Sequence, residues 1–119
     1  MRNADWRGCS MNADDMKKRT RLFALRVIRL AESLPNTPTA ISIRNQMLRS
    51  SPSVGANYRA ACRARSRRDF VSKMGIVEEE ADETSYWMEL LIDAELIRRE
   101  RVSDLLQESP KSYERVGST

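Results

Sequence analysis

The sequence has 119 residues, of which 40% are hydrophobic, 6% aromatic and 32% charged, and its formal net charge is +4. A chain of this length forms one domain, and its scarcity of aromatic residues and glycine favours helices over a sheet. It contains no histidine, which excludes Ser-His-Asp and Cys-His hydrolases and the usual zinc and di-iron sites. We therefore expect a noncatalytic protein without a metal or another cofactor.

The composition also bears on the compartment. No apolar stretch approaches the roughly 18 residues of a membrane span, and the N-terminus lacks the apolar run of a signal peptide. We therefore expect a cytoplasmic protein with no membrane partner. Because cytoplasmic thiols usually stay reduced, we interpret Cys9 and Cys62 as structural or incidental residues and not as a disulfide.

The first 13 residues show no periodicity and are predicted to be a disordered tail, in which Met11 is a candidate alternative start. Asp14 or Asp15 is predicted to cap the first helix, which should stop before Pro35 because a proline disfavours helical geometry in the residue before it. Apolar residues with three-and-four spacing mark its buried face: Met16, Phe23, Val27, Leu30 and Leu34.

The second predicted helix begins with Thr37 as N-cap and Pro38 at the first helical position. Pro52 lacks a backbone donor, so we expect a kink or break at 50–53 with Ser51 capping the continuation. Asn57 is expected to cap or cross-link the backbone near this point. The apolar stripe stays in phase on both sides of the proline: Ile43, Met47, Val54, Tyr58 and Ala61.

A third helix is predicted to begin at Ser66, which with Asp69 resembles a capping box. Its main apolar stripe is Phe70, Met74, Val77, Ala81, Thr84, Met88 and Leu91, and a second stripe is Ile76, Trp87, Leu90, Ala94 and Ile97. Two apolar faces require two sets of neighbours, one of which can be another subunit.

A short fourth helix is predicted around Val102, and the pattern ends near Pro110. The predicted fold is all-α: an antiparallel up-down four-helix bundle over residues 14–107, with a kink or break near Pro52, a short fourth helix and a flexible tail at 108–119.

The charges are segregated along the chain. Residues 16–68 contain thirteen Lys or Arg and one acid, whereas residues 69–97 contain nine acids and one lysine. We expect the basic and acidic helices to pack side by side. The charges would determine which helices are neighbours more than they would stabilise the fold, because exposed ion pairs contribute only about 0–1 kcal/mol each. The expected interhelix ion pairs join Arg59, Arg63 and Arg67 to Glu79, Glu80 and Glu83.

The basic residues of the first helix have no acidic partner nearby in sequence. They are the candidate nucleic-acid-binding residues, since a basic face attracts polyanions through counterion release: Lys17, Lys18, Arg19, Arg21, Arg26 and Arg29. The acids Glu79, Glu80, Asp82 and Glu83 could suggest a divalent metal site. Structural ion pairing is the preferred interpretation, because no histidine or second carboxylate-rich helix completes a ligand set.

Several motifs occur in a fixed order along three helices: Leu34-Pro35, Gln46 with Arg49-Ser50-Ser51, Ser53-Val54-x-Ala56-Asn57, Arg65-Ser66 with Asp69-Phe70, and Glu83. In this set the chain resembles the family of the 23S rRNA intervening sequence protein over roughly residues 18–106. The resemblance implies an antiparallel four-helix bundle that assembles into a homopentamer. In one branch of this family, the accessory proteins of diversity-generating retroelements form a basic pentameric barrel that binds reverse transcriptase and nucleic acid, so the resemblance implies these as candidate partners.

The chain departs from the family pattern at three points. Ala60-Ala61 replaces Glu-Gly, Glu79-Glu80 replaces Gly-Ser, and Pro110 with a polar tail replaces the usual apolar continuation of the fourth helix. The leading hypothesis is an oligomeric bundle that presents a basic surface to RNA or DNA, or to a nucleic-acid enzyme such as a reverse transcriptase. The alternative is an oligomeric scaffold or adaptor with no nucleic-acid role.

Overall fold

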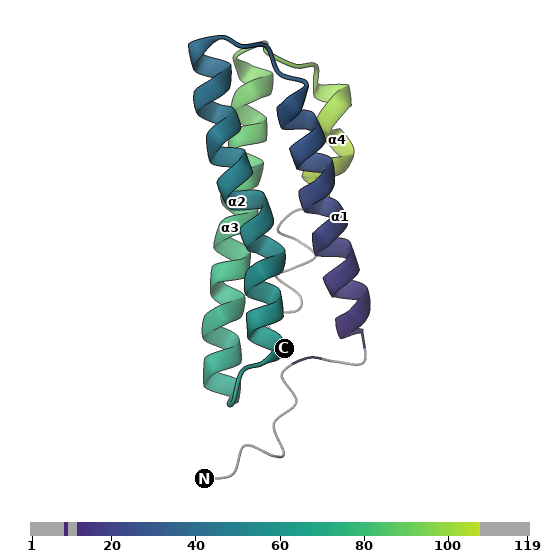
Figure 1. Cartoon of the computed structure of the whole chain (residues 1–119), viewed down its shortest axis with the longest axis vertical. Coiled ribbons are helices and arrows are strands. Elements are labelled where there is room, and N and C mark those ends of the chain that lie inside the picture. Colours follow the sequence, from purple (N-terminus) through teal and green to yellow (C-terminus); the bar gives the residue numbers. More distant parts are fainter. Residues whose placement is uncertain (1–8, 10–11, 108–119) are drawn as a thin grey trace.

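The computed structural model describes residue 9 and residues 12–107. Within them the chain forms no strands and folds into the helices α1 (Ala13–Glu32), α2 (Pro38–Cys62), α3 (Arg67–Asp93) and α4 (Arg99–Gln107). The helices alternate in direction, and short α4 lies beside the C-terminal half of α1 (Figure 1). The predicted all-α bundle with a short fourth helix is confirmed. The predicted tails, 1–13 and 108–119, lie outside the described residues except for Cys9, Asn12 and Ala13.

The helix α2 is the centre of the bundle, since it packs against both α3 and α1, while α4 contacts α1 and α3. The main apolar stripe of α3 is buried along its whole length, as its spacing predicts. The second stripe is only partly covered: Trp87, Leu90 and Ile97 pack against the core, whereas Ile76 is 40% exposed. None of the described helices combines the length and apolarity needed to cross a bilayer.

The start of α1 differs from the prediction by two or three residues. Its N-cap position is Asn12, whose side chain makes no capping hydrogen bond, and Asp14 and Asp15 lie in the first turn. The predicted capping role of these aspartates is therefore wrong. Carboxylates in the first turn still interact favourably with the helix dipole. The end of α1 at Glu32 agrees with the predicted stop before Pro35.

The helix α2 runs without interruption through Pro52, so the predicted break at 50–53 and the capping role of Ser51 are wrong. Side chains supply donors on the C-terminal side of the proline. The Ser53 hydroxyl donates to the Arg49 carbonyl at 2.9 Å, and the Asn57 amide donates to the Ser53 carbonyl at 2.8 Å. Met47 and Val54, on either side of the proline, are fully buried, and this packing holds both halves of the helix in one line. Asn57 thus bonds to the backbone one turn earlier in the same helix, and there is no break for it to cap.

The N-caps of the next two helices follow the sequence signals. The Thr37 hydroxyl accepts from the Ala40 N–H at 3.2 Å, and the Ser66 hydroxyl accepts from the Asp69 N–H at 3.1 Å. The Asp69 carboxylate accepts a hydrogen bond from the Lys73 ammonium group at 2.7 Å. This hydrogen bond lowers the pKa of the Asp69 carboxyl. This pair joins residues one turn apart at the start of α3.

The C-terminus of α3 closes in a Schellman motif around Glu95. The Glu95 N–H donates to the Ile92 carbonyl and the Leu96 N–H to the Leu91 carbonyl, both at 2.9 Å. This motif places its central residue in the left-handed region, and Glu95 has a φ of 59°. Glycine is the usual residue at such a position, so the turn that leads into α4 carries backbone strain.

Cys9 and Cys62 form a disulfide, with their Cα atoms 5.1 Å apart. The interpretation of these residues as unpaired thiols is therefore wrong. That interpretation came from the expected compartment and not from distance, since a separation of 53 residues says nothing about proximity in space. The bond ties the chain before α1 to the last residue of α2.

Candidate nucleic-acid interface

The outer face of α1 is basic because its apolar residues occupy the inner face. Met16, Thr20, Phe23, Val27 and Leu30 are among its buried residues, and the 3.6-residue period turns the remaining positions outward. The predicted nucleic-acid-binding residues all lie there: Lys17 is half-buried, and Lys18, Arg19, Arg21, Arg26 and Arg29 are exposed. We call these six residues the α1 basic face.

Four members of the α1 basic face have no acidic partner among the described residues. Lys17, Lys18, Arg21 and Arg29 make no ion pair with any acid of that part of the chain. Arg19 donates to the Met16 sulfur at 3.6 Å. The positive charge of the face is therefore left largely uncompensated by neighbouring carboxylates.

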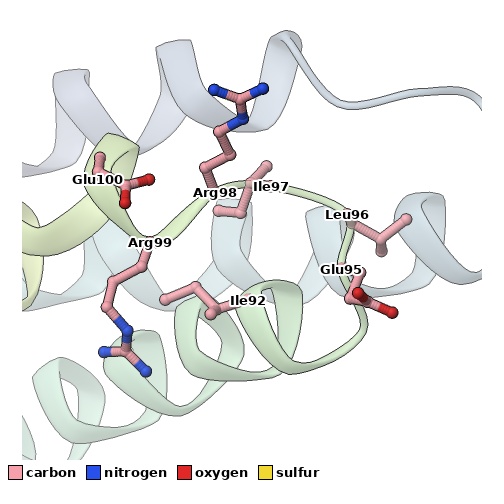
Figure 2. A pocket seen from close by; sticks show the side chains of 7 residues that line it. All are labelled: Ile92, Glu95, Leu96, Ile97, Arg98, Arg99 and Glu100. Carbon is pink, nitrogen blue, oxygen red and sulfur yellow. The ribbon is translucent and has the colours of Figure 1, made fainter.

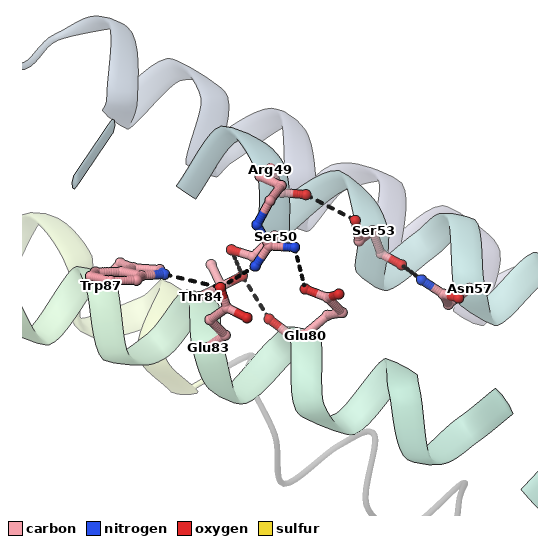
Figure 3. A network of polar contacts seen from close by, with 8 residues as sticks. All are labelled: Arg49, Ser50, Ser53, Asn57, Glu80, Glu83, Thr84 and Trp87. Carbon is pink, nitrogen blue, oxygen red and sulfur yellow. Dashed lines mark hydrogen bonds and ion pairs between the residues drawn. The ribbon is translucent and has the colours of Figure 1, made fainter. Parts of the chain in front are cut away.

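The predicted pairing of α2 with α3 involves two of the three expected glutamates and a different arginine. Glu80 and Glu83 bind Arg49, whose Nη1 donates to Glu80 at 3.4 Å while Nη2 donates to Glu83 (Figure 3). Neither Arg59 nor Arg63 forms an ion pair with Glu79, Glu80 or Glu83 within the described residues. Both arginines are exposed, as are Arg67, in the first turn of α3, and Glu79.

The register of the α2–α3 hairpin explains this difference. In an antiparallel pair, residues equally far from the turn face each other. Arg49 lies 14 residues before Arg63, and Glu80 lies 14 residues after Ser66, at the two edges of the turn. By the same count Arg59 faces residue 70, about 2.5–3.6 helical turns from the three glutamates. Counting outward from the turn would have identified Arg49 from the sequence.

The contacts between Arg49 and Glu83 shift the pKa values of both groups. The hydrogen bond from Arg49 lowers the pKa of the Glu83 carboxyl below its ordinary value of 4.5, and this effect outweighs the partial desolvation of the carboxyl. The Trp87 indole N–H, which donates to the same carboxylate at 3.4 Å, acts in the same direction. The same contact with Glu83 raises the pKa of Arg49. The Glu83 carboxylate therefore stays charged to a lower pH than an isolated glutamate does.

Buried hydroxyl groups lie beside this ion pair. The Ser50 and Thr84 oxygens are 2.7 Å apart, and Thr84 also donates to the Glu80 carbonyl at 2.8 Å (Figure 3). Because a hydroxyl has one proton, Ser50 is the donor toward Thr84. The neighbouring Ser51 hydroxyl is buried and has no hydrogen-bond partner. These residues join α2 to α3 and are not aimed at a ligand.

Two hollows open on the α1 basic face. Between α1 and α2 lies a groove of about 300 Å³, to which Lys17, Arg21 and Arg59 contribute cations. Between α1 and α4 a second hollow of about 300 Å³ is lined by Arg26, Arg29 and Arg101 over Leu30 and Leu105. The face thus divides into two parts, each next to a concave surface.

A third hollow of about 490 Å³ lies at the turn between α3 and α4. Its charged side chains do not converge: Arg98 and Arg99 point away from each other, and Glu95 and Glu100 lie at opposite ends of the segment (Figure 2). A binding site needs polar groups that meet at one point. This hollow is therefore a weaker candidate than the two beside the α1 basic face.

The acidic residues of α3 do not gather into a metal site in the described part of the chain. No group of three or more His, Cys, Asp or Glu side chains is positioned there to hold a metal ion. Glu80 and Glu83, which the metal interpretation would require, are both engaged by Arg49.

These features define a small all-α bundle with a cationic outer face. The chain belongs to the family of the 23S rRNA-intervening sequence protein, whose model matches residues 14–115. A crystal structure of a protein of unknown function, from the S23 ribosomal protein family of Bacteroides thetaiotaomicron, is 38% identical with a TM-score of 0.82, over 92% of this chain and 100% of that chain. A search of curated proteins finds no match. The family resemblance read from the sequence motifs is thus confirmed.

Proposed function

We propose that the protein is a noncatalytic, self-associating helical bundle that presents the α1 basic face to nucleic acid or to a nucleic-acid enzyme such as a reverse transcriptase. The observation that carries the proposal is the absence of acidic partners for Lys17, Lys18, Arg21 and Arg29 among the described residues. Exposed Arg59 and Arg63 extend the same charge onto α2. A surface of this kind supports electrostatic attraction to phosphates, not recognition of base sequence.

Salt dependence tests the proposal directly, because each neutralised phosphate releases counterions. Four contacts to a single strand give a slope of log K against log salt of about −3, which is about a 50-fold loss of affinity between about 50 and about 200 mM salt. Fluorescence anisotropy with labelled RNA and DNA oligonucleotides measures this slope. Affinity that is undetectable at low salt contradicts the proposal.

A charge-matched pair of variants locates the surface. Replacing Lys18, Arg21 and Arg29 by Gln should abolish most of the salt-dependent binding, since it removes three exposed cations of the α1 basic face. The control replaces Arg68, Arg98 and Arg99, which are exposed elsewhere on the bundle, and removes the same net charge. Equal losses in the two variants would mean that net charge alone, and no particular face, determines the binding.

A second candidate function is an oligomeric scaffold or adaptor. Leu22 and Leu25 on the outer side of α1 are 58% and 39% exposed, and Val71, Ile76 and Tyr86 on α3 are 40–53% exposed. Apolar side chains at these positions favour contact with another protein surface, including a further copy of this chain. Native mass measurement gives the subunit number, for which the family resemblance leads us to expect five. A scaffold without a nucleic-acid role would assemble and show no binding at either salt concentration.

A further inference from the structure

The groove between α1 and α2 is lined by three cations and by small apolar residues that we call its floor. Its volume is about 300 Å³, its cations are Lys17, Arg21 and Arg59, and its floor includes Ala24, Pro52 and Ala56. None of the three cations forms an ion pair with an acid of residues 12–107. An anionic occupant would therefore meet positive groups from two helices without displacing a carboxylate.

The contact between Gly55 and Thr20 shows which residues of α1 and α2 lie at the same level along the groove. A Cβ atom added at Gly55 would lie 3.0 Å from the Thr20 hydroxyl, so the two helices approach closely at this point. Because α1 and α2 are antiparallel, Lys17, three residues before Thr20, and Arg59, four residues after Gly55, lie toward the same end, about 5–6 Å along the axes. Ala24 and Pro52 lie toward the opposite end. Lys17 and Arg59 thus mark a cationic end and Ala24 and Pro52 an apolar end, while Arg21 and Ala56, each one residue from the Thr20–Gly55 contact, lie near the middle of the groove.

We propose that this groove binds one unpaired nucleotide of a single-stranded nucleic acid. Lys17, Arg21 and Arg59 hold the phosphate, and the base lies against Ala24, Pro52 and Ala56. The inference rests on the proposed function and deepens it, since it names the form of nucleic acid. The small side chains of the floor leave room for a flat ring, and the volume matches the lower end of the range for ligand pockets. A base inside a duplex is stacked and paired, so it cannot reach the floor.

The cationic end is tested by the salt slope. Arg59→Gln should reduce the magnitude of the slope for a single strand by about 0.7, the value for one lost phosphate contact. Arg98→Gln is the matched control, because Arg98 is exposed and lies at the α3–α4 turn, outside the groove. The probe is a fluorescein-labelled oligothymidylate of about 15 nucleotides. Equal slopes for the two variants would overturn the assignment of Arg59.

The apolar floor is tested by filling it at Ala56, near the middle of the groove, without changing charge. Ala56→Leu should weaken binding of the oligothymidylate by about threefold or more, a modest effect because the floor has no aromatic ring for stacking. A strand of the same length with abasic sites should bind Ala56→Leu and the wild-type protein with equal affinity. The control is Asn45→Leu, also exposed on α2 and about 16 Å away on the same side of the helix. An equal loss for the abasic strand would overturn the placement of the base.

The failures of the two proposals are distinguishable. If wild-type protein binds in a salt-dependent manner and Ala56→Leu binds the intact strand as wild type does, the groove inference fails and the proposed function stands. If wild-type protein binds no oligonucleotide at low salt, both fail. If Ala56→Leu weakens binding of a poly-glutamate peptide and leaves the oligothymidylate unaffected, the groove takes an acidic protein segment and the nucleotide assignment is overturned. Circular dichroism confirms that each variant is folded.

Discussion

Ser50 donates a buried hydrogen bond to Thr84, with 2.7 Å between the two oxygens, and thereby joins α2 to α3 at the centre of the bundle. Its neighbour Ser51 is equally buried, but its hydroxyl has no partner. Adjacent serines in one helix thus provide a comparison in which only the hydrogen bonding differs.

Ser50→Ala should destabilise the fold by about 1 kcal/mol, because one buried hydrogen bond is lost. Ser51→Ala should leave stability unchanged or raise it, because it removes a hydroxyl whose burial costs free energy and whose loss of water is not offset by a hydrogen bond. Urea unfolding followed by circular dichroism measures both. Equal destabilisation by the two substitutions would contradict the proposed difference in hydrogen bonding.

The strained turn after α3 predicts a stabilising substitution. Glu95→Gly should stabilise the protein by about 1 kcal/mol, because glycine adopts the left-handed conformation without the steric cost that Glu95 carries at a φ of 59°. Ala94→Gly, one residue earlier at a φ of −81°, is the control and should bring no gain. Thermal unfolding compares the two. A Glu95→Gly variant with a lower Tm than wild type would refute the strain argument.

The glycines inside helices should respond to alanine in different ways. A Cβ at Gly75 meets nothing within 4 Å, so Gly75→Ala should stabilise α3 by about 0.5–1 kcal/mol through reduced chain entropy and better helix propensity. A Cβ at Gly55 would press on the Thr20 side chain, with its oxygen at 3.0 Å and its Cβ at 3.4 Å. Gly55→Ala should therefore be the less stable variant of the two in urea unfolding. Truncating Thr20 to Ala in the same chain should recover part of the difference.

The contact between Arg49 and Glu83 should make stability depend on pH in the acid range. The folded-state pKa of Glu83 lies below the ordinary value of 4.5, so the folded chain releases this proton more readily than the unfolded chain does. Its stabilising contribution is present above about pH 4.5 and is lost as pH falls through the folded-state pKa. Glu83→Gln should accordingly show a smaller fall in Tm than wild type between about pH 6 and about pH 3.

A control separates this contact from the interactions expected from sequence. Arg49→Gln should reduce the acid-range fall in Tm as Glu83→Gln does, and combining the two changes should add little, because both remove one interaction. Arg59→Gln should leave the acid-range profile unchanged, since Arg59 makes no ion pair within the described residues. If Arg59→Gln markedly reduced the acid-range fall in Tm, the pairing of Arg59 with the glutamates of α3 that the sequence predicts would be favoured.

The disulfide should make stability depend on redox conditions. Closing a loop between residues 53 apart stabilises by about 4 kcal/mol in the chain-entropy model, so reductant should lower the Tm substantially. Cys9→Ser should have the Tm of the reduced wild type and should not respond to reductant. If reductant leaves the wild-type Tm unchanged, the bond does not contribute to stability.

Much of the fold could be predicted because it depends on local patterns. The stripe from Phe70 to Leu91, the N-caps Thr37 and Ser66, and the short last helix all follow from residue spacing and side-chain chemistry within a few positions. The continuity of α2 at Pro52 runs against the local preference of proline and depends on packing against two neighbouring helices, which buries Met47 and Val54 on either side of it. The apolar stripe that stays in phase on both sides of the proline was the sequence signal for this continuity.

The candidate site was predictable in its charge and not in its contacts. The exposed position of the α1 basic face follows from the apolar positions on its other side. The groove with Arg59 does not, because Arg59 was assigned to α3 and lies instead beside Lys17 and Arg21 across the α1–α2 contact. The bond between Cys9 and Cys62 was missed for a related reason, since spatial proximity over 53 residues depends on the assembled bundle.

The bond from Cys9 to Cys62 also closes α1, the connection at 33–37 and all of α2 into one covalent ring. A protease that cuts the connection once opens the ring but leaves both fragments attached through sulfur. Such a nicked molecule would keep its full mass on a non-reducing gel and would separate into two pieces only when thiol is added. Gel migration with and without thiol after limited digestion thus reports, in the same assay, on the linkage and on the accessibility of that connection.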